Sequence, residues 1–441
     1  AAFCWQIMGQ ADFTRTDVAH LLRRTGFLAK PAEVDALMGK ASWSAVVDAA
    51  LTTTGSPADT IPADIADTTT PLGKSIVTAH RYWLNRMATT PTPIVEKVAF
   101  FWHGILTSAV PNPDMLPVFK QIQTWRTLGL GDLHTLMQAM AIDPAMLDYL
   151  DNAANVKKAP NENFARELME LFTMGNGTFS ENDVIAMARA WTGHNLQYAT
   201  QTYLYKPAQH DTGQKTLFGI TKNWDGPDTI TEILRGSKQP VSARYLAGRI
   251  WSAFASPNPS ATLLDELTQS LIAANLNVKA FLKVVFLRPE FRVSSTRTAL
   301  VRSPIEWEAA ILRATGLPVE QLGIEKYQQR LGQVLYRPPN VSGWRQNRAW
   351  ISSSAVWAKG EISSVLRTKL QAAGTFTAWN ALSVPDAVDA ALTRFSIKEP
   401  SSASRTRLEA YLAGERSAGR SGTASAGLGA LITLTPDFQL S

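Results

Sequence analysis

The chain has 441 residues, 45% of them hydrophobic and 18% charged, which is the composition of a globular protein with a sizeable core. Its net charge of +6 comes without a long basic run, so nucleic-acid binding is disfavoured. Cys4 is the only cysteine, which excludes an internal disulfide and a cysteine zinc cluster and favours an extracytoplasmic (periplasmic or secreted) location.

Hydrophobic periodicity predicts a mainly α protein without a transmembrane segment. The first helices are expected at 17–24, 32–39 and 43–51, before a Pro- and Thr-rich surface connection at 52–71. Further helices are expected at 73–88, 93–108, 115–127, 131–140, 144–151, 161–173 and 181–192. After an aperiodic stretch at 197–226, helices are expected at 228–235, 241–254, 261–273, 277–286, 303–315, 351–372 and 386–394. The Gly- and Ser-rich segment 415–428 is predicted to be a mobile linker or loop.

These elements predict a large multi-helix globular array with one irregular or small-hairpin lobe near 197–226. We expect N-terminal helices at 1–51, a helical core with a polar cluster at 73–196, and the lobe at 197–226. A C-terminal helical region, 227–441, is expected to pack on the same core. Residues 13–441 would then form one domain.

The segment 161–175 contains the most informative pattern. Its apolar residues recur at helical spacing and predict a buried face: Phe164, Leu168, Leu171 and Phe172. Its polar residues share a neighbouring stripe: Glu162, Asn163, Arg166, Glu167 and Glu170. The segment has no lysine, so Arg166 faces three carboxylates and either Arg189 or a cation is expected to join them. The stripe is either a carboxylate pair for acid–base catalysis, with Arg166 as a clamp, or a buried ion-pair network that fixes helix packing.

Three histidines are candidate site residues. His103, in the helix 93–108, is either a proton carrier or metal ligand, or a packed histidine bonded to a backbone carbonyl. His194 follows Gly193 just past a helix end, where it either reaches a pocket or favours the helix dipole. His210 next to Asp211 suits contact with an anion or a metal.

The loop 336–344 presents Asn340 and Trp344, which either line a cleft or cap a helix. Thirteen tryptophans are compatible with sugar stacking, although most are expected in the core. The chain contains none of the G-x-S-x-G, H-E-x-x-H, P-loop or Rossmann signatures.

Several segments, in order along the chain, resemble the bacterial family known as domain of unknown function 1800. They are His20–Phe27, Trp83–His103, Asn161–Gly175, Asp183–Gly193, His210–Gly219, Ser303–Glu306 and Pro338–Trp344. The resemblance implies a largely helical, mostly exported bacterial protein, often found beside a sulfatase-like partner protein. It supplies no activity. Members of the family often have His-x-His after the Phe-Trp pair, whereas this chain has Ile105 as the second of these residues, so His103 stands alone.

Three hypotheses follow. The first is an envelope or secreted hydrolase acting on a glycan or similar polymer, with catalytic Glu162, Arg166, Glu167, Glu170, His103 and His194. Its substrate-binding residues would be Asn163, Arg189, His210, Asp211, Asn340 and Trp344. The second is a divalent metal site formed by the carboxylates with His103, His194 or His210. Ligation mainly by oxygen would favour calcium, magnesium or manganese, whereas added histidine would favour iron or zinc. The third is a non-catalytic scaffold or binding protein whose polar cluster is structural.

Overall fold

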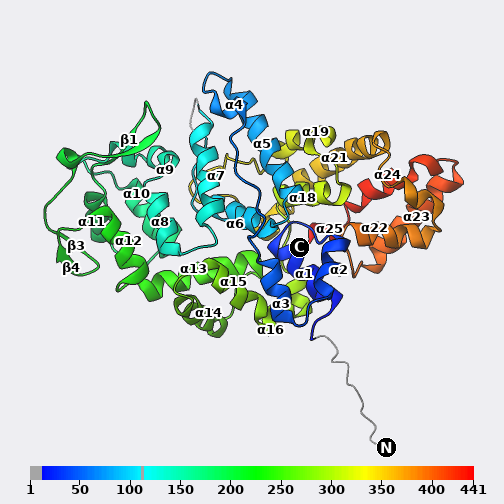
Figure 1. The fold of residues 1–441 in the computed structure, drawn as a ribbon, viewed down its shortest axis with the longest axis horizontal. Helices are drawn as coiled ribbons and strands as arrows, with labels where there is room; N and C mark the ends of the chain where they lie inside the picture. Colours follow the sequence, from blue (N-terminus) through cyan, green and yellow to red (C-terminus); the bar gives the residue numbers. More distant parts are fainter. Residues whose placement is uncertain (1–11, 111–113) are drawn as a thin grey trace, which may run out of the picture.

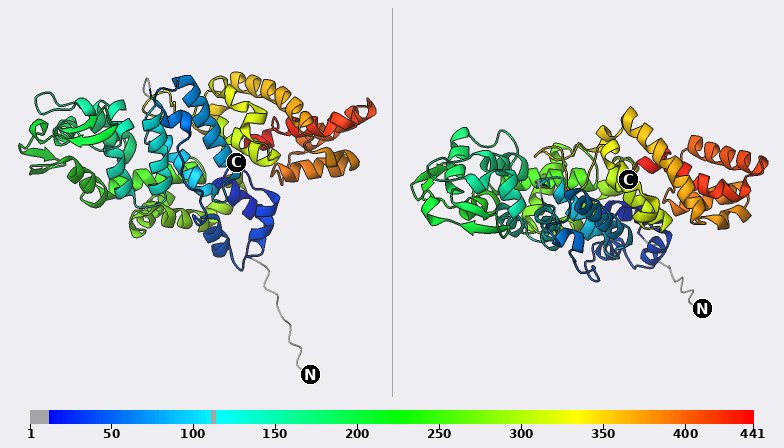
Figure 2. Two further views of the ribbon diagram at one scale, coloured as in Figure 1. Left: turned by 45° about the horizontal axis from the view of Figure 1, so that its top comes forward. Right: turned by 90° about the horizontal axis from the view of Figure 1, so that it is seen from above.

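The computed structural model describes residues 12–110 and 114–441, so Cys4 lies outside the described residues. In these ranges the chain forms 25 α-helices and two antiparallel sheets of two strands each, which confirms the mainly α prediction. The molecule is elongated. The hairpins lie at one end and the helices of residues 384–432 lie at the other (Figure 1; Figure 2). Within the described ranges, no helix combines the length and apolar character that crossing a membrane requires.

The first helices form the middle of the molecule. Thr14 and Asp17 cap the first of them reciprocally, side chain to backbone. Two helices differ from the prediction: one short helix interrupts the connection 52–71, and the helix predicted at 93–108 already ends at His103. The bounds are α1 (Arg15–Thr25), α2 (Pro31–Met38), α3 (Trp43–Ala50), α4 (Ala63–Ala66), α5 (Leu72–Thr89), α6 (Pro93–His103) and α7 (Leu116–Leu128).

The next elements form a lobe at one end of the molecule (Figure 1). The predicted loss of helical period corresponds to two hairpins, β1–β2 and β3–β4, in which His194 pairs with Tyr205 and Lys215 with Lys222. The bounds are α8 (Leu133–Ala141), α9 (Pro144–Tyr149), α10 (Asn163–Glu167), α11 (Glu181–Ala190), β1 (His194–Gln197), β2 (Thr202–Tyr205), β3 (Lys215–Leu217), β4 (Ile220–Lys222) and α12 (Gly226–Arg235). Short 3-10 turns lie at Asn152–Ala154 and Pro207–Gln209.

The helix predicted at 161–173 changes its winding. It is α-helical over Asn163–Glu167 and π-helical over Leu168–Thr173. The Thr173 hydroxyl donates to the Leu168 carbonyl five residues earlier, and the Met174 amide donates to Met169 in the same i−5 pattern. The wider turn shifts the side chains that follow Leu168 around the helix.

The remaining helices lead from the lobe back to the middle and on to the far end. They are α13 (Gln239–Phe254), α14 (Ala261–Ala273), α15 (Val278–Leu287), α16 (Pro289–Arg292), α17 (Ser294–Arg297), α18 (Pro304–Thr315), α19 (Val319–Leu322), α20 (Gln328–Leu331), α21 (Ser353–Ala372), α22 (Val384–Arg394), α23 (Ser402–Ser417), α24 (Ser421–Ile432) and α25 (Pro436–Gln439). Further 3-10 turns lie at Ile324–Tyr327, Asn347–Trp350 and Thr377–Ala381.

The prediction of a mobile linker at 415–428 is wrong. The segment contains the end of α23 and most of α24, whose small residues are buried. A Cβ atom on Gly427 would come within 1.7 Å of the Tyr411 hydroxyl, and one on Gly429 within 2.7 Å of the Phe376 ring. Glycine therefore allows close packing here, and that packing outweighs its low helix propensity.

One buried ion-pair group holds the central helices together. Glu96 on α6 is fully buried and accepts hydrogen bonds from Arg86 on α5, Arg126 on α7 and the Trp83 indole. Arg126 also pairs with Asp59 at 3.0 Å, so the connection 52–71 is tied to the same group. None of its residues belongs to the segment 161–175, where the polar cluster was predicted.

Candidate metal centre

The polar stripe of the segment 161–175 lies at the surface. Arg166 pairs with Glu162 at 3.2 Å and with Glu181 of α11 at 2.8 Å, and these three side chains are 34%, 44% and 73% exposed. Of the two interpretations of the stripe, the buried ion-pair network is therefore wrong, because the apolar face alone packs inward. Arg189 is not part of the stripe. The residue that joins it is another acid, Glu181.

The other polar residues of the stripe are also accessible. The Asn163 amide donates to Asp151 at 3.0 Å. Glu167 and Glu170 are half-buried. Partial burial raises the pKa of Glu167, and the charge of Glu170 adds to this effect.

His103 lies in the core. Its Nε2 accepts the Tyr336 amide at 3.0 Å, and burial lowers its pKa to about 3. The imidazole is therefore neutral, fully enclosed and engaged with the backbone. His103 is thus packed in the core, but its backbone partner is the Tyr336 amide and not the predicted carbonyl.

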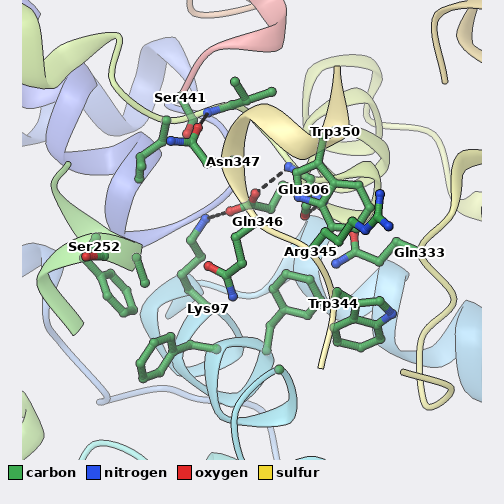
Figure 3. Close-up of a pocket in the computed structure, with 18 of the residues that line it drawn as sticks. Lys97, Ser252, Glu306, Gln333, Trp344, Arg345, Gln346, Asn347, Trp350 and Ser441 are labelled. Atoms are coloured by element: carbon green, nitrogen blue, oxygen red, sulfur yellow. Dashed lines mark hydrogen bonds and ion pairs between the residues drawn. The ribbon is translucent and has the colours of Figure 1, made fainter. Parts of the chain in front are cut away.

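The two candidates in the loop 336–344 have different surroundings. Asn340 is exposed, and its side chain accepts the Ser342 amide within the turn. Trp344 is buried, stacks on Phe100 with ring centroids 6.0 Å apart, and lines a cavity (Figure 3).

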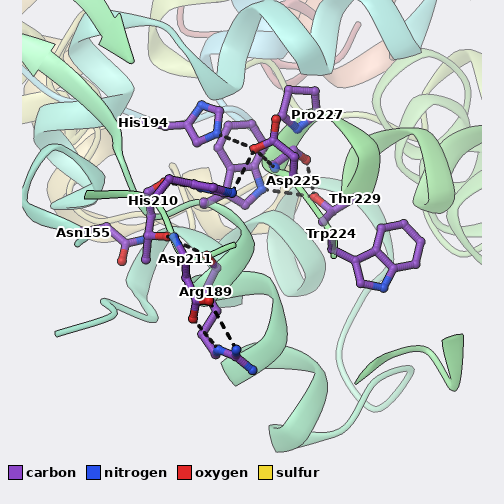
Figure 4. A network of polar contacts seen from close by, with 12 residues as sticks. Asn155, Arg189, His194, His210, Asp211, Trp224, Asp225, Pro227 and Thr229 are labelled. Carbon is purple, nitrogen blue, oxygen red and sulfur yellow. Dashed lines mark hydrogen bonds and ion pairs between the residues drawn. The ribbon is translucent and has the colours of Figure 1, made fainter. Parts of the chain in front are cut away.

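His194 and His210 meet in the lobe, where Asp225 joins them (Figure 4). The Asp225 Oδ1 atom lies 3.0 Å from Nε2 of His194 and 3.8 Å from Nε2 of His210. Both imidazole side chains are buried, at 3% and 5% exposure, whereas that of Asp225 is 47% exposed. The cluster is therefore open to solvent on the carboxylate side.

Gly193 allows the two histidines to approach each other. Its φ is +80°, and a Cβ atom there would lie 2.8 Å from the Lys206 carbonyl oxygen and 3.0 Å from the His210 amide. The Lys206 amide donates to the Gly193 carbonyl at 2.8 Å. This close contact brings the segment that carries His210 beside the start of β1.

The second nitrogen of each imidazole also has a partner. Nδ1 of His210 donates to the Thr192 carbonyl at 2.8 Å, so its Nε2 presents a lone pair when the ring is neutral. Nδ1 of His194 lies 2.9 Å from the Tyr203 hydroxyl. Such outer contacts orient imidazole rings that bind metals.

Asp225 is fixed by its place at the start of α12. Its carboxylate accepts the Gly226 amide at 2.8 Å, as N-cap of the helix. Partial burial raises the pKa of Asp225, but the hydrogen bonds from His194 and Gly226 and the nearby imidazoles outweigh it, so the pKa is lowered. The carboxylate is therefore kept ionised.

Arg189 and Asp211 stabilise the turn that carries His210 (Figure 4). Arg189 pairs with Asp211 at 2.7 Å, and the Asp211 amide donates to the Thr192 hydroxyl. The buried Lys215 ammonium donates to four oxygens around this turn, including the Asp211 and Trp224 carbonyls. These contacts connect the segments that carry His210 and Asp225.

The three candidate ligand atoms lie close enough together to hold a transition metal after small shifts of their side chains. Ligands at about 2.0–2.1 Å from one zinc ion lie roughly 3–3.5 Å apart. The two separations from Asp225 Oδ1 are 3.0 and 3.8 Å, and all three atoms lie within 4.8 Å of one another. Two imidazoles and one carboxylate favour zinc or iron over calcium or magnesium and leave coordination positions for water or substrate.

A protein-family model described as "Protein of unknown function (DUF1800)" matches residues 20–440. The chain belongs to this family. No curated protein and no solved structure matches the chain. The resemblance inferred from the motifs is thus confirmed, and the candidate metal centre lies inside the DUF1800 domain.

Asp225 is the one residue of the centre that the sequence of this DUF1800 member did not indicate. The segment Trp224-Asp225-Gly226-Pro227 is a typical helix start, in which an aspartate is expected as the cap. Its only signal was its position at the end of the aperiodic stretch that also contains His210. Because capping accounts for an aspartate at this position, no sequence pattern groups Asp225 with the histidines.

Proposed function

We propose that this protein is a metal-dependent hydrolase whose metal ligands are His194, His210 and Asp225. The observation that supports the proposal is the convergence of two oriented imidazole Nε2 atoms and one carboxylate at a solvent-open position. Among residues 12–110 and 114–441, the other histidines form no such grouping: His20 and His80, for example, contact backbone carbonyls in the core.

A divalent metal held by three protein ligands activates water, lowering its pKa to about 7, and polarises a carbonyl oxygen. The chain's own residues hold the site in place. His210 is kept in one tautomer by the Thr192 carbonyl, and the lowered pKa of Asp225 keeps its carboxylate available as a ligand. The open side at Asp225 gives a substrate access.

The chemistry of the centre favours an acyl bond as the target. Glycosidic cleavage uses two carboxylates that flank the bond, whereas this centre has one carboxylate and two imidazoles. A metal held by His194, His210 and Asp225 would instead supply an activated water and polarise a carbonyl, which is the chemistry of ester or amide hydrolysis. We therefore propose that the reaction removes acyl groups carried by a glycan or similar polymer.

An exposed aromatic ring beside the centre supports a glycan substrate. The Tyr205 ring lies 5.0 Å from the His194 ring and 5.7 Å from the His210 ring, and it is 37% exposed. Such rings stack on the apolar faces of sugars. The extracytoplasmic location and the sulfatase-like partner protein stay predictions.

Elemental mass spectrometry of protein purified without chelator tests the metal. We expect about one zinc or iron per chain, and a lower melting temperature after EDTA treatment. His210→Asn and Asp225→Asn should lose most of the metal. Their matched controls are His134→Asn, on α8, and Asp228→Asn, an exposed residue of α12, and both should keep it. Metal-free wild-type protein that EDTA does not affect would rule the centre out.

The reaction is tested on acetylated polysaccharides with two readouts. Acetate release that depends on the metal and is lost in Asp225→Asn supports acyl hydrolysis. New reducing ends that are lost in Glu167→Gln, and not in Asp225→Asn, would instead favour catalysis by the polar stripe of 161–175. A loaded metal with neither product would indicate a non-catalytic metal site.

A further inference from the structure

A cavity that is partly open to solvent lies between segments of the middle of the molecule, apart from the lobe that carries the metal centre (Figure 3). It encloses about 100 Å³, which is room for several waters or a small organic molecule. Segments distant in sequence form it: α6, the end of α13, the start of α18 and the stretch 344–350. Five aromatic residues line it: Phe100, Phe101, Phe254, Trp344 and Trp350.

A buried ion pair faces this cavity. The Lys97 ammonium of α6 donates to the Glu306 carboxylate of α18, whose other oxygen accepts the Ser303 amide at 2.8 Å. An ammonium group has three N–H donors. Among residues 12–110 and 114–441, Glu306 is the only hydrogen-bond acceptor of Lys97, and the Phe27 ring lies 5.2 Å from its nitrogen. Lys97 therefore has donors left for a ligand.

The surroundings of this ion pair carry an excess of positive charge. Arg24, which also lines the cavity, and Arg302 are both almost fully buried. Arg24 donates to the Thr296 carbonyl and the Ser441 hydroxyl, and Arg302 donates to the Phe438 carbonyl. In the described part of the chain neither arginine pairs with a side-chain carboxylate, and both donate to neutral oxygen atoms. Unpaired buried charge is costly, and an anion in the cavity would reduce that cost.

We propose that this cavity binds a small organic carboxylate. The ligand's carboxylate group accepts the free donors of Lys97, and its apolar part lies against Phe101, Phe254 and Trp344. The aromatic walls favour an organic acid over phosphate or sulfate, because those ions would lose hydration on all sides without replacement contacts. The site is independent of the metal centre, so each can be tested without the other.

Isothermal titration calorimetry of the whole protein with matched probes tests this proposal. Benzoate and butyrate are the carboxylates, benzamide is the neutral counterpart of benzoate, and inorganic phosphate is the plain anion. We expect saturable binding of at least one carboxylate, with benzamide and phosphate at least about tenfold weaker, because they lack either the charge or the apolar part. Equal binding of benzoate and benzamide, or of benzoate and phosphate, contradicts the proposal, as does a lack of binding by both carboxylates.

Variants then place the binding in the cavity. Lys97→Met should remove the preference for benzoate over benzamide. Lys359→Met is the matched control, because Lys359 is also buried but contacts Gln439 outside the cavity. Ala253→Phe fills the cavity and leaves the Lys97–Glu306 pair in place, so it tests the site even if Lys97→Met fails to fold. Benzoate binding that survives Ala253→Phe overturns the assignment.

Discussion

The Nε2 atom of His194 lies 3.0 Å from the Asp225 Oδ1 atom, although 31 residues separate them in the sequence. The contact joins the first residue of β1 to the cap of α12, across both hairpins. His210 approaches the same oxygen from the intervening segment. Three short stretches of chain thus bring their ligand atoms to one point on the lobe.

The Tyr203 hydroxyl is expected to act as a positioning group for His194. Tyr203→Phe removes the partner 2.9 Å from Nδ1, so the ring loses one of its two fixed contacts. We expect metal affinity to fall about 10- to 100-fold, measured by competition with a chromogenic chelator, while the metal-free protein keeps its melting temperature. Tyr205→Phe, on the same strand, is the control and should keep wild-type affinity. Unchanged affinity in Tyr203→Phe would show that this hydroxyl does not orient His194.

Gly193 and Gly177 make a matched pair for testing the close approach in the lobe. Both have a positive φ, +80° at Gly193 and +78° at Gly177. A Cβ atom on Gly193 would clash with the Lys206 carbonyl, whereas one on Gly177 would meet open space. Gly177→Ala should cost about 1 kcal/mol of unfolding free energy, from the backbone conformation alone. Gly193→Ala should cost more, at least about 2 kcal/mol, because the clash adds to it, and it should also weaken metal binding. Urea unfolding measures the free energy lost in each variant. Equal losses would show that the contact between Gly193 and Lys206 is not tight.

Glu96 is expected to be the most sensitive carboxylate for stability. Glu96→Gln leaves Arg86 and Arg126 buried with less compensating charge, so we expect a loss of about 3–5 kcal/mol in chemical unfolding. Glu409→Gln removes an exposed pair with Arg405 on α23 and should cost at most about 0.5 kcal/mol. Metal content should be unchanged in both variants, since neither residue lies in the lobe. A loss below about 1 kcal/mol for Glu96→Gln would mean that Asp59 compensates for the missing charge.

Asp17 should make the free energy of unfolding depend on pH. Partial burial raises its pKa, but hydrogen bonds from Arg292 and Thr14 outweigh that effect and hold the pKa below 3.8. The unfolded carboxyl group therefore takes up a proton first, so the stabilisation is complete above the unfolded pKa and is lost as pH falls through the folded one. Asp17→Asn should cost about 1–3 kcal/mol near pH 7. The difference from wild type should shrink below pH 3.8, and a difference that stays constant down to pH 2.5 would contradict this assignment.

Local sequence patterns predicted most helices within a few residues. The pairs Thr14–Asp17 and Ser180–Asp183 satisfy unpaired amides at helix starts through neighbours three residues away, so short-range chemistry is sufficient to identify them. The loss of period near 197–226 likewise located the hairpins. The segment 415–428 was misjudged because its helix depends on Tyr411 and Phe376 packing against glycines, which is a contact between elements.

The sequence by itself determined the helical class and the family, because periodicity, caps and motifs are encoded over a few neighbouring residues. It also named His194 and His210 among three histidines that could bind a metal. Only the tertiary structure decided which polar residues meet. It exposed Glu162 and Arg166, buried His103 against a backbone amide, and brought Asp225 to His194 and His210. The physical reason is that a binding site depends on distances between atoms of different segments. Those distances are set by the packing of the whole lobe, including a turn at Gly193 that admits no side chain.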